Sequence, residues 1–92
     1  MAGDINDVTI QYEEDGQVLV QELDKVLLSK GAWSTVIFRY QQWEGGKGAF
    51  SKDRYTIRRY RKVGDEYRQQ SKFNISSPDQ AQKLIDALQQ WI

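Results

Sequence analysis

The sequence contains no cysteine and no histidine, and proline occurs once in 92 residues. Without cysteine the chain cannot form a disulfide framework, which is typical of proteins in a reducing compartment such as the cytoplasm. Without histidine it lacks the most common general base and the most common zinc ligand. These absences argue against a catalytic or metal-binding protein, so we expect neither an enzyme nor a cofactor.

Long hydrophobic runs are also absent. No stretch approaches the roughly 20 apolar residues needed to cross a bilayer, and the polar, acidic residues 1–7 do not resemble a signal peptide. We therefore expect no membrane association and a cytoplasmic location. A chain of 92 residues suits one domain with a modest core. Residues 1–92 are accordingly interpreted as a single domain, in which residues 1–16 form an additional strand or an extension.

The net charge is zero, but the charges are distributed unevenly. Residues 1–29 contain seven acidic residues and one basic residue, whereas residues 30–73 contain eleven basic and four acidic residues. The middle segment also contains nine of the eleven aromatic residues. This asymmetry indicates an anionic partner for the middle segment. A further hypothesis is that the acidic first segment competes with this partner for the basic surface, which deletion of residues 1–16 would test.

Alternation of apolar and polar residues predicts five extended segments. They cover residues 8–12, 17–28, 33–43, 54–63 and 66–76. Asp15-Gly16 and Gly64-Asp65 are typical of two-residue hairpin turns, and the glycine-rich residues 44–53 predict a flexible loop.

A C-terminal helix is predicted by a cluster of start signals. Ser77 is a favourable N-cap, Pro78 occupies the first helical position, and Gln80 stands where a capping box requires it. We expect the apolar stripe that follows to pack on one face of the sheet, or in part to pair with a partner's helix; it contains Ala81, Leu84, Ile85, Leu88 and Ile92. The predicted fold is α+β, an antiparallel β-meander of four to five strands followed by one C-terminal helix. Because one helix cannot cover all the apolar surface of a small sheet, we expect a homodimer.

Sorting segments 54–63 and 66–76 by alternation predicts one polar face on these two strands. This face is expected to present five cations and a tyrosine, namely Arg54, Arg58, Lys62, Arg68, Lys72 and Tyr60. The residues of opposite parity in segment 54–63 are expected to face inward, and the charged side chains of Arg59 and Arg61 interrupt this pattern. The interruption indicates a bulge or an edge position. The preceding segment adds three residues that share a parity: Trp33, Arg39 and Trp43.

Cations interleaved with aromatic rings suit single-stranded nucleic acid for two reasons. The cations neutralise phosphates and release counterions, and exposed rings stack on unpaired bases without regard to sequence. The nine residues named above therefore predict a non-enzymatic protein that binds single-stranded DNA or RNA, with no small-molecule substrate. Two alternatives remain open. The face could be an ordinary solvated side of an antiparallel sheet, or a protein-interaction surface for an acidic partner.

From Trp33 onward, the order of features resembles the positive cofactor 4 family of transcriptional coactivators, including its bacterial relatives. The family's aromatic-x-Ile-Arg-acidic-aromatic strand is similar to residues 55–60 (Tyr-Thr-Ile-Arg-Arg-Tyr), with Arg59 in the acidic position. Its Asn-Pro-Glu-Gln helix opening is similar to residues 77–80 (Ser-Pro-Asp-Gln), and its Lys-Gly-x-Trp turn to residues 30–33.

The resemblance covers roughly residues 17–92. It implies a homodimer of curved four-stranded sheets with C-terminal helices, which grips single strands in strand-lined channels. It also implies that Arg58, Tyr60 and Lys72 lie on the binding strands, and that the protein acts in transcription or DNA handling. The family's Lys-Gly-Ile before the helix is replaced by residues 72–75 (Lys-Phe-Asn-Ile), which changes the register expected of the last strand.

Overall fold

The computed structural model describes residues 3–92. A short 3-10 helix, η1 (Ile5–Asp7), precedes the strands, and a long helix follows them. The strands are β1 (Tyr12–Glu14), β2 (Gln17–Ser29), β3 (Trp33–Glu44), β4 (Ala49–Phe50), β5 (Arg54–Val63) and β6 (Glu66–Ile75), and the helix is α1 (Pro78–Trp91). The predicted α+β architecture, an antiparallel meander followed by one C-terminal helix, is therefore confirmed.

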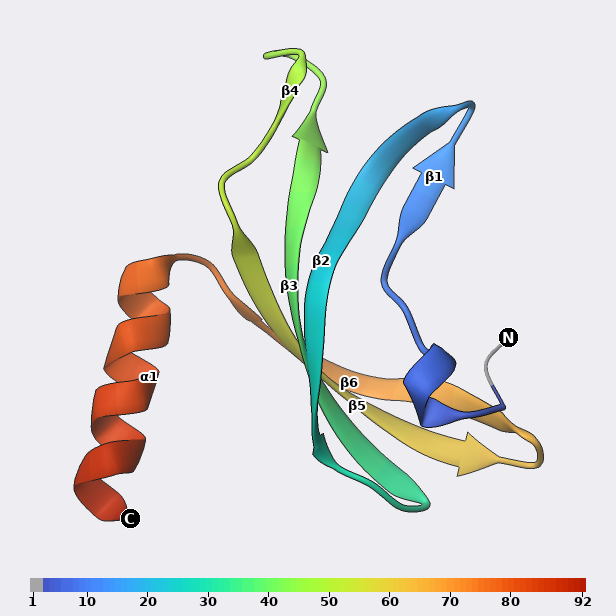
Figure 1. The fold of residues 1–92 in the computed structure, drawn as a ribbon, viewed down its shortest axis with the longest axis vertical. Coiled ribbons are helices and arrows are strands. Elements are labelled where there is room, and N and C mark those ends of the chain that lie inside the picture. Colours follow the sequence, from blue (N-terminus) through green and yellow to red (C-terminus); the bar gives the residue numbers. More distant parts are fainter. Residues whose placement is uncertain (1–2) are drawn as a thin grey trace.

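The strands form one curled sheet in the order β1-β2-β3-β5-β6, and every pairing is antiparallel (Figure 1). β4 pairs only with the end of β3, inside the segment predicted as a flexible loop. The first predicted strand, residues 8–12, is displaced, because residues 8–11 lie across the sheet and pairing with β2 begins at Tyr12. The other predicted strands agree with the structure to within one residue.

Both predicted hairpin turns have the backbone geometry that their glycines allow. Asp15 and Gly16 have φ values of +50° and +79°, so the β1–β2 turn places two successive residues in the left-handed region, as a type I′ turn requires. Gly64, the first residue of the β5–β6 turn, has a φ of +62°. These turns fix β1 against β2 and β5 against β6.

The two faces of the sheet have different neighbours. We call the face that packs against residues 3–11 the inner face, and the opposite one the outer face. The core lies on the inner face, where three residues of the N-terminal segment pack against β3 and β5: Ile5, Val8 and Ile10 against Val36, Phe38 and Tyr60. Burying an aliphatic side chain of this size stabilises a fold by about 1.5–3 kcal/mol. The N-terminal segment (residues 3–11) is thus part of the core.

Polar contacts also fix the N-terminal segment to β2. The Lys25 ammonium donates hydrogen bonds to the carbonyl oxygens of Asn6 and Val8. The Glu22 carboxylate accepts hydrogen bonds from the Thr9 hydroxyl (2.7 Å) and the Ile10 N–H (3.3 Å). These contacts provide hydrogen-bond partners for the backbone carbonyls of Asn6 and Val8 and the N–H of Ile10, which lie outside the paired strands.

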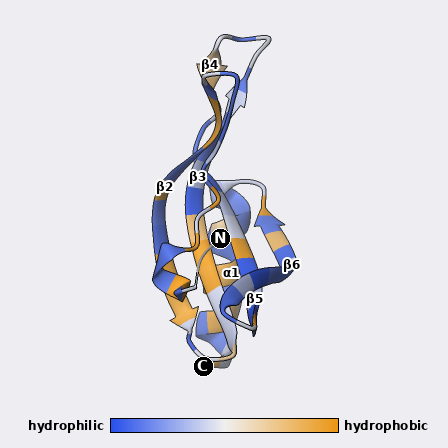
Figure 2. Cartoon of the chain, turned by 90° about the vertical axis from the view of Figure 1, so that its right-hand side faces the viewer, coloured by the Kyte–Doolittle hydropathy of each residue, from blue (hydrophilic) through white to orange (hydrophobic). Residues whose placement is uncertain are grey.

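A row of four apolar side chains crosses the outer face. The register places Val26 of β2 opposite Ile37 of β3, Ile37 opposite Ile57 of β5, and Ile57 opposite Phe73 of β6. Val26 and Phe73, at the two ends of this apolar row, are 56% and 49% exposed. Figure 1 shows the N-terminal segment and α1 on opposite sides of the sheet, and Figure 2 views the sheet from the side of the N-terminal segment. The outer face is therefore the less covered of the two.

The helix begins as predicted but packs differently. The Ser77 hydroxyl accepts a hydrogen bond from the Gln80 N–H (3.2 Å), and the Gln80 side chain accepts one from the Ser76 N–H (2.8 Å). However, no residue of α1 is buried, and Leu88 and Trp91 are 53% and 78% exposed. The expected packing of the stripe on the sheet is wrong, because the N-terminal segment supplies the apolar residues that cover the inner face.

Candidate nucleic-acid interface

The structure divides the nine predicted binding residues between the two faces. The inner face carries Arg54, Arg58, Tyr60, Lys62 and Lys72, and the outer face carries Trp33, Arg39, Trp43 and Arg68. A bulge explains the difference. The register of β5 and β6 shifts between Arg59 and Tyr60, so that Tyr60 lies opposite Gln69 and Lys62 opposite Tyr67. The extra residue in β6 moves Arg68 to the outer face, and the prediction that it shares a face with Lys72 is wrong.

Tyr60 lies beneath the N-terminal segment and is only 5% exposed. Burial raises the pKa of its hydroxyl, and Glu22 raises it further, while the neighbouring Arg58 guanidinium lowers it. A ring in this position has no free face to offer a base. The expectation that Tyr60 stands among the cations of an open surface is therefore wrong, since alternation gives no sign of a cover supplied by a distant segment.

The inner-face arginines are held by neighbouring amides. Arg58 donates from Nη1 to Gln69 (2.9 Å), and Arg54 donates from Nη1 to Gln42 (3.1 Å). Both are half-buried, and the Nε of Arg58 is buried without a partner. Lys62 and Lys72 are exposed. The cations of the inner face thus lie around a covered core, so they form a rim and not a continuous open platform.

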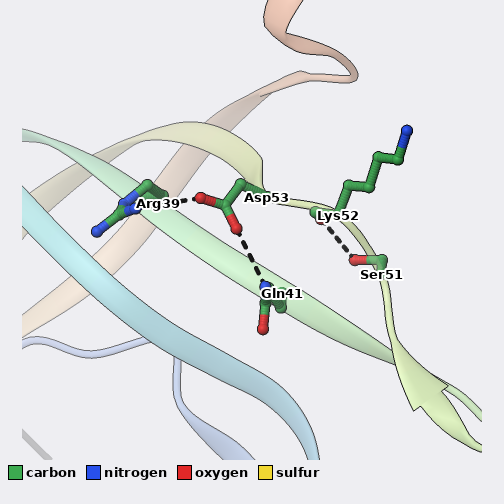
Figure 3. A network of polar contacts seen from close by, with 5 residues as sticks. All are labelled: Arg39, Gln41, Ser51, Lys52 and Asp53. Atoms are coloured by element: carbon green, nitrogen blue, oxygen red, sulfur yellow. Dashed lines mark hydrogen bonds and ion pairs between the residues drawn. The ribbon is translucent and has the colours of Figure 1, made fainter.

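Two outer-face candidates, Arg39 and Trp43, contact the β3–β5 connection, and Figure 3 shows the contacts of Arg39. Arg39 forms an ion pair with one oxygen of Asp53 (3.1 Å), and Gln41 donates a hydrogen bond to the other (3.1 Å). Trp43 packs edge-on against Phe50 of β4, with 5.2 Å between ring centroids and 72° between ring planes. These contacts give Arg39 and Trp43 structural roles at the end of the sheet that carries β4.

Trp33 has different surroundings, at the opposite end of β3. Its ring is 42% exposed and lies beside two arginines, with the guanidinium carbons of Arg59 and Arg61 at 4.4 and 5.4 Å from its centroid. Cross-strand pairing sets Arg61 opposite both Trp33 and Arg68. Stacking on the indole keeps the guanidinium groups extended along the face. One exposed ring and three arginines are therefore brought together on the outer face.

Two lysines lie around the same end of the sheet. The Lys62 N–H donates a hydrogen bond to Ala32 O (2.7 Å), which joins β5 to the turn before β3. The Lys62 ammonium lies 5.8 Å from the Tyr67 ring centroid, and the Tyr67 hydroxyl donates to Gly31 O (3.0 Å). Lys30 is exposed in the same turn. We call this region the basic end, which comprises Trp33, Lys30, Arg59, Arg61, Lys62 and Arg68.

The basic end contains residues that the sequence interpretation missed. The sequence predicts Arg59 and Arg61 only as the mark of a bulge or an edge position, although their spacing of two places them on one face of β5. That spacing, together with a tryptophan at the start of the neighbouring strand, is the signal that points to them. Lys30 was predicted only as part of a turn motif.

The charges of the basic end are poorly balanced within the protein. Among the five cations of the basic end, only Arg68 has an acidic partner within residues 3–92: its guanidinium lies 3.7 Å from Glu66. Arg39 and Lys47, at the other end of β3, both form ion pairs. Like charges that face one another across strands destabilise a sheet, so an anionic ligand would stabilise the basic end.

No family model, no curated protein and no solved structure matches the chain. The similarity to the positive cofactor 4 family stays a prediction. Over residues 3–92, the acidic side chains form no group of three or more that could hold a metal ion. In the same part of the chain, no helix is both long and apolar enough to span a membrane.

Proposed function

We propose that this protein binds single-stranded nucleic acid without catalysis and with little sequence specificity, DNA being the first candidate. The observation that supports this most directly is the exposed Trp33 ring beside Arg59 and Arg61. In this proposal the Trp33 ring stacks on a base, and the two neighbouring guanidinium groups bind phosphates. In this proposal the basic end makes the main contact, and Lys72 and the inner-face arginines extend it along β5 and β6.

The preference for single strands follows from the geometry of stacking. A base can stack on the Trp33 ring only if it is not already stacked and paired in a duplex, and such a contact contributes about 1–3 kcal/mol per base. Arginine and lysine neutralise phosphates in any sequence, and each phosphate contact makes binding weaker as the salt concentration rises. A cytoplasmic protein of this kind would act in transcription or DNA handling, as its resemblance to the positive cofactor 4 family suggests.

A homodimer belongs to the same proposal. The apolar row of the outer face and the stripe of α1 are two exposed apolar surfaces on one small chain. Monomeric proteins rarely expose several such patches, and a second copy supplies complementary ones by symmetry. We propose that these surfaces pair between two copies, which leaves the basic ends free.

Binding is tested by titrating the protein with a labelled single strand of about 20 nucleotides and with its duplex, at two salt concentrations. We expect tighter binding to the single strand, and weaker binding in higher salt. Trp33→Ala should reduce affinity about 5- to 150-fold, the equivalent of one lost stacking contact. Trp91→Ala, the same change on the exposed helix, is the control and should leave affinity unchanged. No binding to either ligand at low salt would refute the proposal.

A second candidate function is a protein-interaction module that binds an acidic partner. The exposed apolar row and helix stripe favour it, because protein interfaces have an apolar centre and a charged rim. Fluorescence distinguishes the two functions. Stacked bases should quench Trp33, and the quenching should disappear in Trp33→Phe while affinity is largely kept. Binding of an acidic peptide without any response to single strands would favour the module.

A further inference from the structure

A small cavity lies at the basic end, on the inner side of the sheet. Its volume is about 170 Å3, and it is open to solvent on one side. The lining residues come from three places in the chain: Gly3, Asp4, Ile5, Lys30, Lys62 and Tyr67. The N-terminal segment, the turn before β3 and the β5–β6 hairpin therefore meet around one cavity.

The cavity has two cations and one acid. In the described part of the chain, neither Lys30 nor Lys62 forms an ion pair. Asp4 is the N-cap of η1, and its carboxylate accepts a hydrogen bond from the Asn6 N–H (2.9 Å). One carboxylate oxygen is thus already engaged within the segment. Two unpaired ammonium groups around a small open cavity provide donors for an anion with several oxygens.

The cavity and the Trp33 ring lie on two sides of the same end of the sheet. Lys62 directly follows Arg61, and alternation along β5 sends their side chains to opposite faces. The hydrogen bond from the Lys62 N–H to Ala32 O holds this position beside the residue that precedes Trp33. A chain that leaves the Trp33 ring and passes around the turn at residues 30–32 therefore reaches the cavity next.

We infer that this cavity binds a backbone phosphate of the strand whose base stacks on Trp33. The inference rests on the proposed function and specifies the path of the ligand, which crosses the end of the sheet from the outer to the inner side. Lys30 and Lys62 contact the phosphate, and Asp4 opposes it by charge. The acidic N-terminal segment thus weakens binding through one carboxylate while it remains packed on the core.

The first test removes the two cations. We compare Lys30→Gln/Lys62→Gln with Lys52→Gln/Lys83→Gln, which removes the same charge from exposed lysines outside the cavity. The loss of one phosphate contact should reduce the slope of log affinity against log salt by about 0.7, and lower affinity about fivefold near 0.1 M salt. Quenching of Trp33 at saturation should persist, because the base still stacks. The control variant should keep the wild-type slope.

The second test changes only the charge of residue 4. Asparagine caps a helix as well as aspartate does, so Asp4→Asn keeps the hydrogen bond to Asn6 and removes the negative charge. We expect about two- to fivefold tighter binding in the wild-type background. The gain should be smaller when Lys30 and Lys62 are both glutamine, because coupled residues give non-additive effects.

Two outcomes separate this inference from the function on which it rests. If the wild-type protein neither binds single strands nor shows quenching, the proposed function itself fails. If binding and quenching are normal but the cavity variant matches the Lys52/Lys83 control in affinity and slope, the function stands and the cavity site is refuted. An unchanged melting temperature in both double variants confirms that the comparison reports binding and not unfolding.

Discussion

The inner and outer faces of the sheet come from the same strands, yet the inner face, which buries hydroxyl groups, is the more covered one, and the face with an apolar row across four strands is the more open one. The inner face buries Ser34 and Thr56 beside Val36 and Phe38. The apolar row of the outer face is uninterrupted across four strands but stays largely open at its ends. Hydrophobicity of a face is therefore a poor guide to its burial in this protein, because burial depends on which other segment reaches it.

Hydrogen bonding explains how the inner face tolerates its buried hydroxyls. Ser34 donates to Gly31 O (2.9 Å) and accepts from the Gly31 N–H (3.2 Å). Thr56 lies 2.8 Å from the Asn74 side-chain oxygen and donates to it. A buried hydroxyl with a partner costs little, whereas one without a partner costs about 1–3 kcal/mol. On the outer face, by contrast, Val26 and Phe73 at the ends of the apolar row stay about half exposed.

The largest expected effect is on the free energy of unfolding, when one phenylalanine from each face is replaced by alanine. Phe38 is fully buried on the inner face, and Phe73 is about half exposed on the outer face. Phe38→Ala should lower the free energy of unfolding by about 3–5 kcal/mol, whereas Phe73→Ala should cost markedly less. Urea denaturation of both variants measures the difference. Equal losses would contradict the contrast between the faces, and would mean that the outer face is covered in solution.

The second prediction tests whether a second copy covers the outer face. Leu88→Lys places a charge on the exposed stripe of α1 and should raise the dimer dissociation constant at least about tenfold, a loss of about 1.4 kcal/mol. Gln89→Lys adds the same charge at the next residue, outside the apolar stripe, and should have little effect. Sedimentation equilibrium over a range of concentrations measures both. A wild-type protein that stays monomeric throughout would refute dimerisation.

The third prediction concerns the cover over the inner face. Because burial raises the pKa of Tyr60 above its unfolded value of about 10, the unfolded state loses this proton first as the pH rises. The Tyr60 contribution to stability is therefore complete below about pH 10 and declines above it. Tyr60→Phe should remove this part of the alkaline loss, as seen by urea denaturation at several pH values. Tyr12→Phe, at an exposed tyrosine, is the control, and equal behaviour of the two variants would argue against a covered inner face.

The smallest effect is expected for the outer-face ion pair of Arg39 and Asp53. Both side chains are partly exposed, at 46% and 33%, so solvent screens their attraction. Arg39→Gln should lower the free energy of unfolding by no more than about 1 kcal/mol and leave single-strand affinity nearly unchanged. Arg59→Gln, the same change at the basic end, should instead weaken binding. A larger stability loss for Arg39→Gln would indicate that this part of the outer face is covered in the assembled protein.

The structure also changes how the competition hypothesis is tested. Deletion of residues 1–16 would remove Ile5, Val8 and Ile10 together with the acidic residues, so lost binding would reflect a lost core. A single charge substitution at Asp4 avoids this problem. The acidic N-terminal segment packs on the inner face of the sheet through its apolar residues Ile5, Val8 and Ile10.

Local signals in the sequence determined the strands, their turns and the start of the helix. Asp15-Gly16 and Gly64 specify tight turns because glycine adopts positive φ without steric cost, and these turns fix the pairing of the strands on either side. Ser77, Pro78 and Gln80 specify the helix start through hydrogen bonds within four residues. Interactions of such short range can be inferred from neighbouring residues alone.

Only the tertiary structure decided which face is covered and which residues share a surface. The bulge opposite Arg59 and Tyr60 reverses the parity of β6; Arg59 and Arg61 indicated a bulge or an edge position in their own strand, but nothing in the sequence placed the extra residue in β6. The N-terminal segment covers Tyr60, although more than fifty residues separate Ile5 from it. Strand alternation sorts side chains into two sets, but the free energy of burial depends on distant segments that compete to cover each set. For that reason the sequence alone predicts Tyr60 at an open surface. In the folded chain, the exposed candidate site is formed instead by Trp33, Arg59 and Arg61.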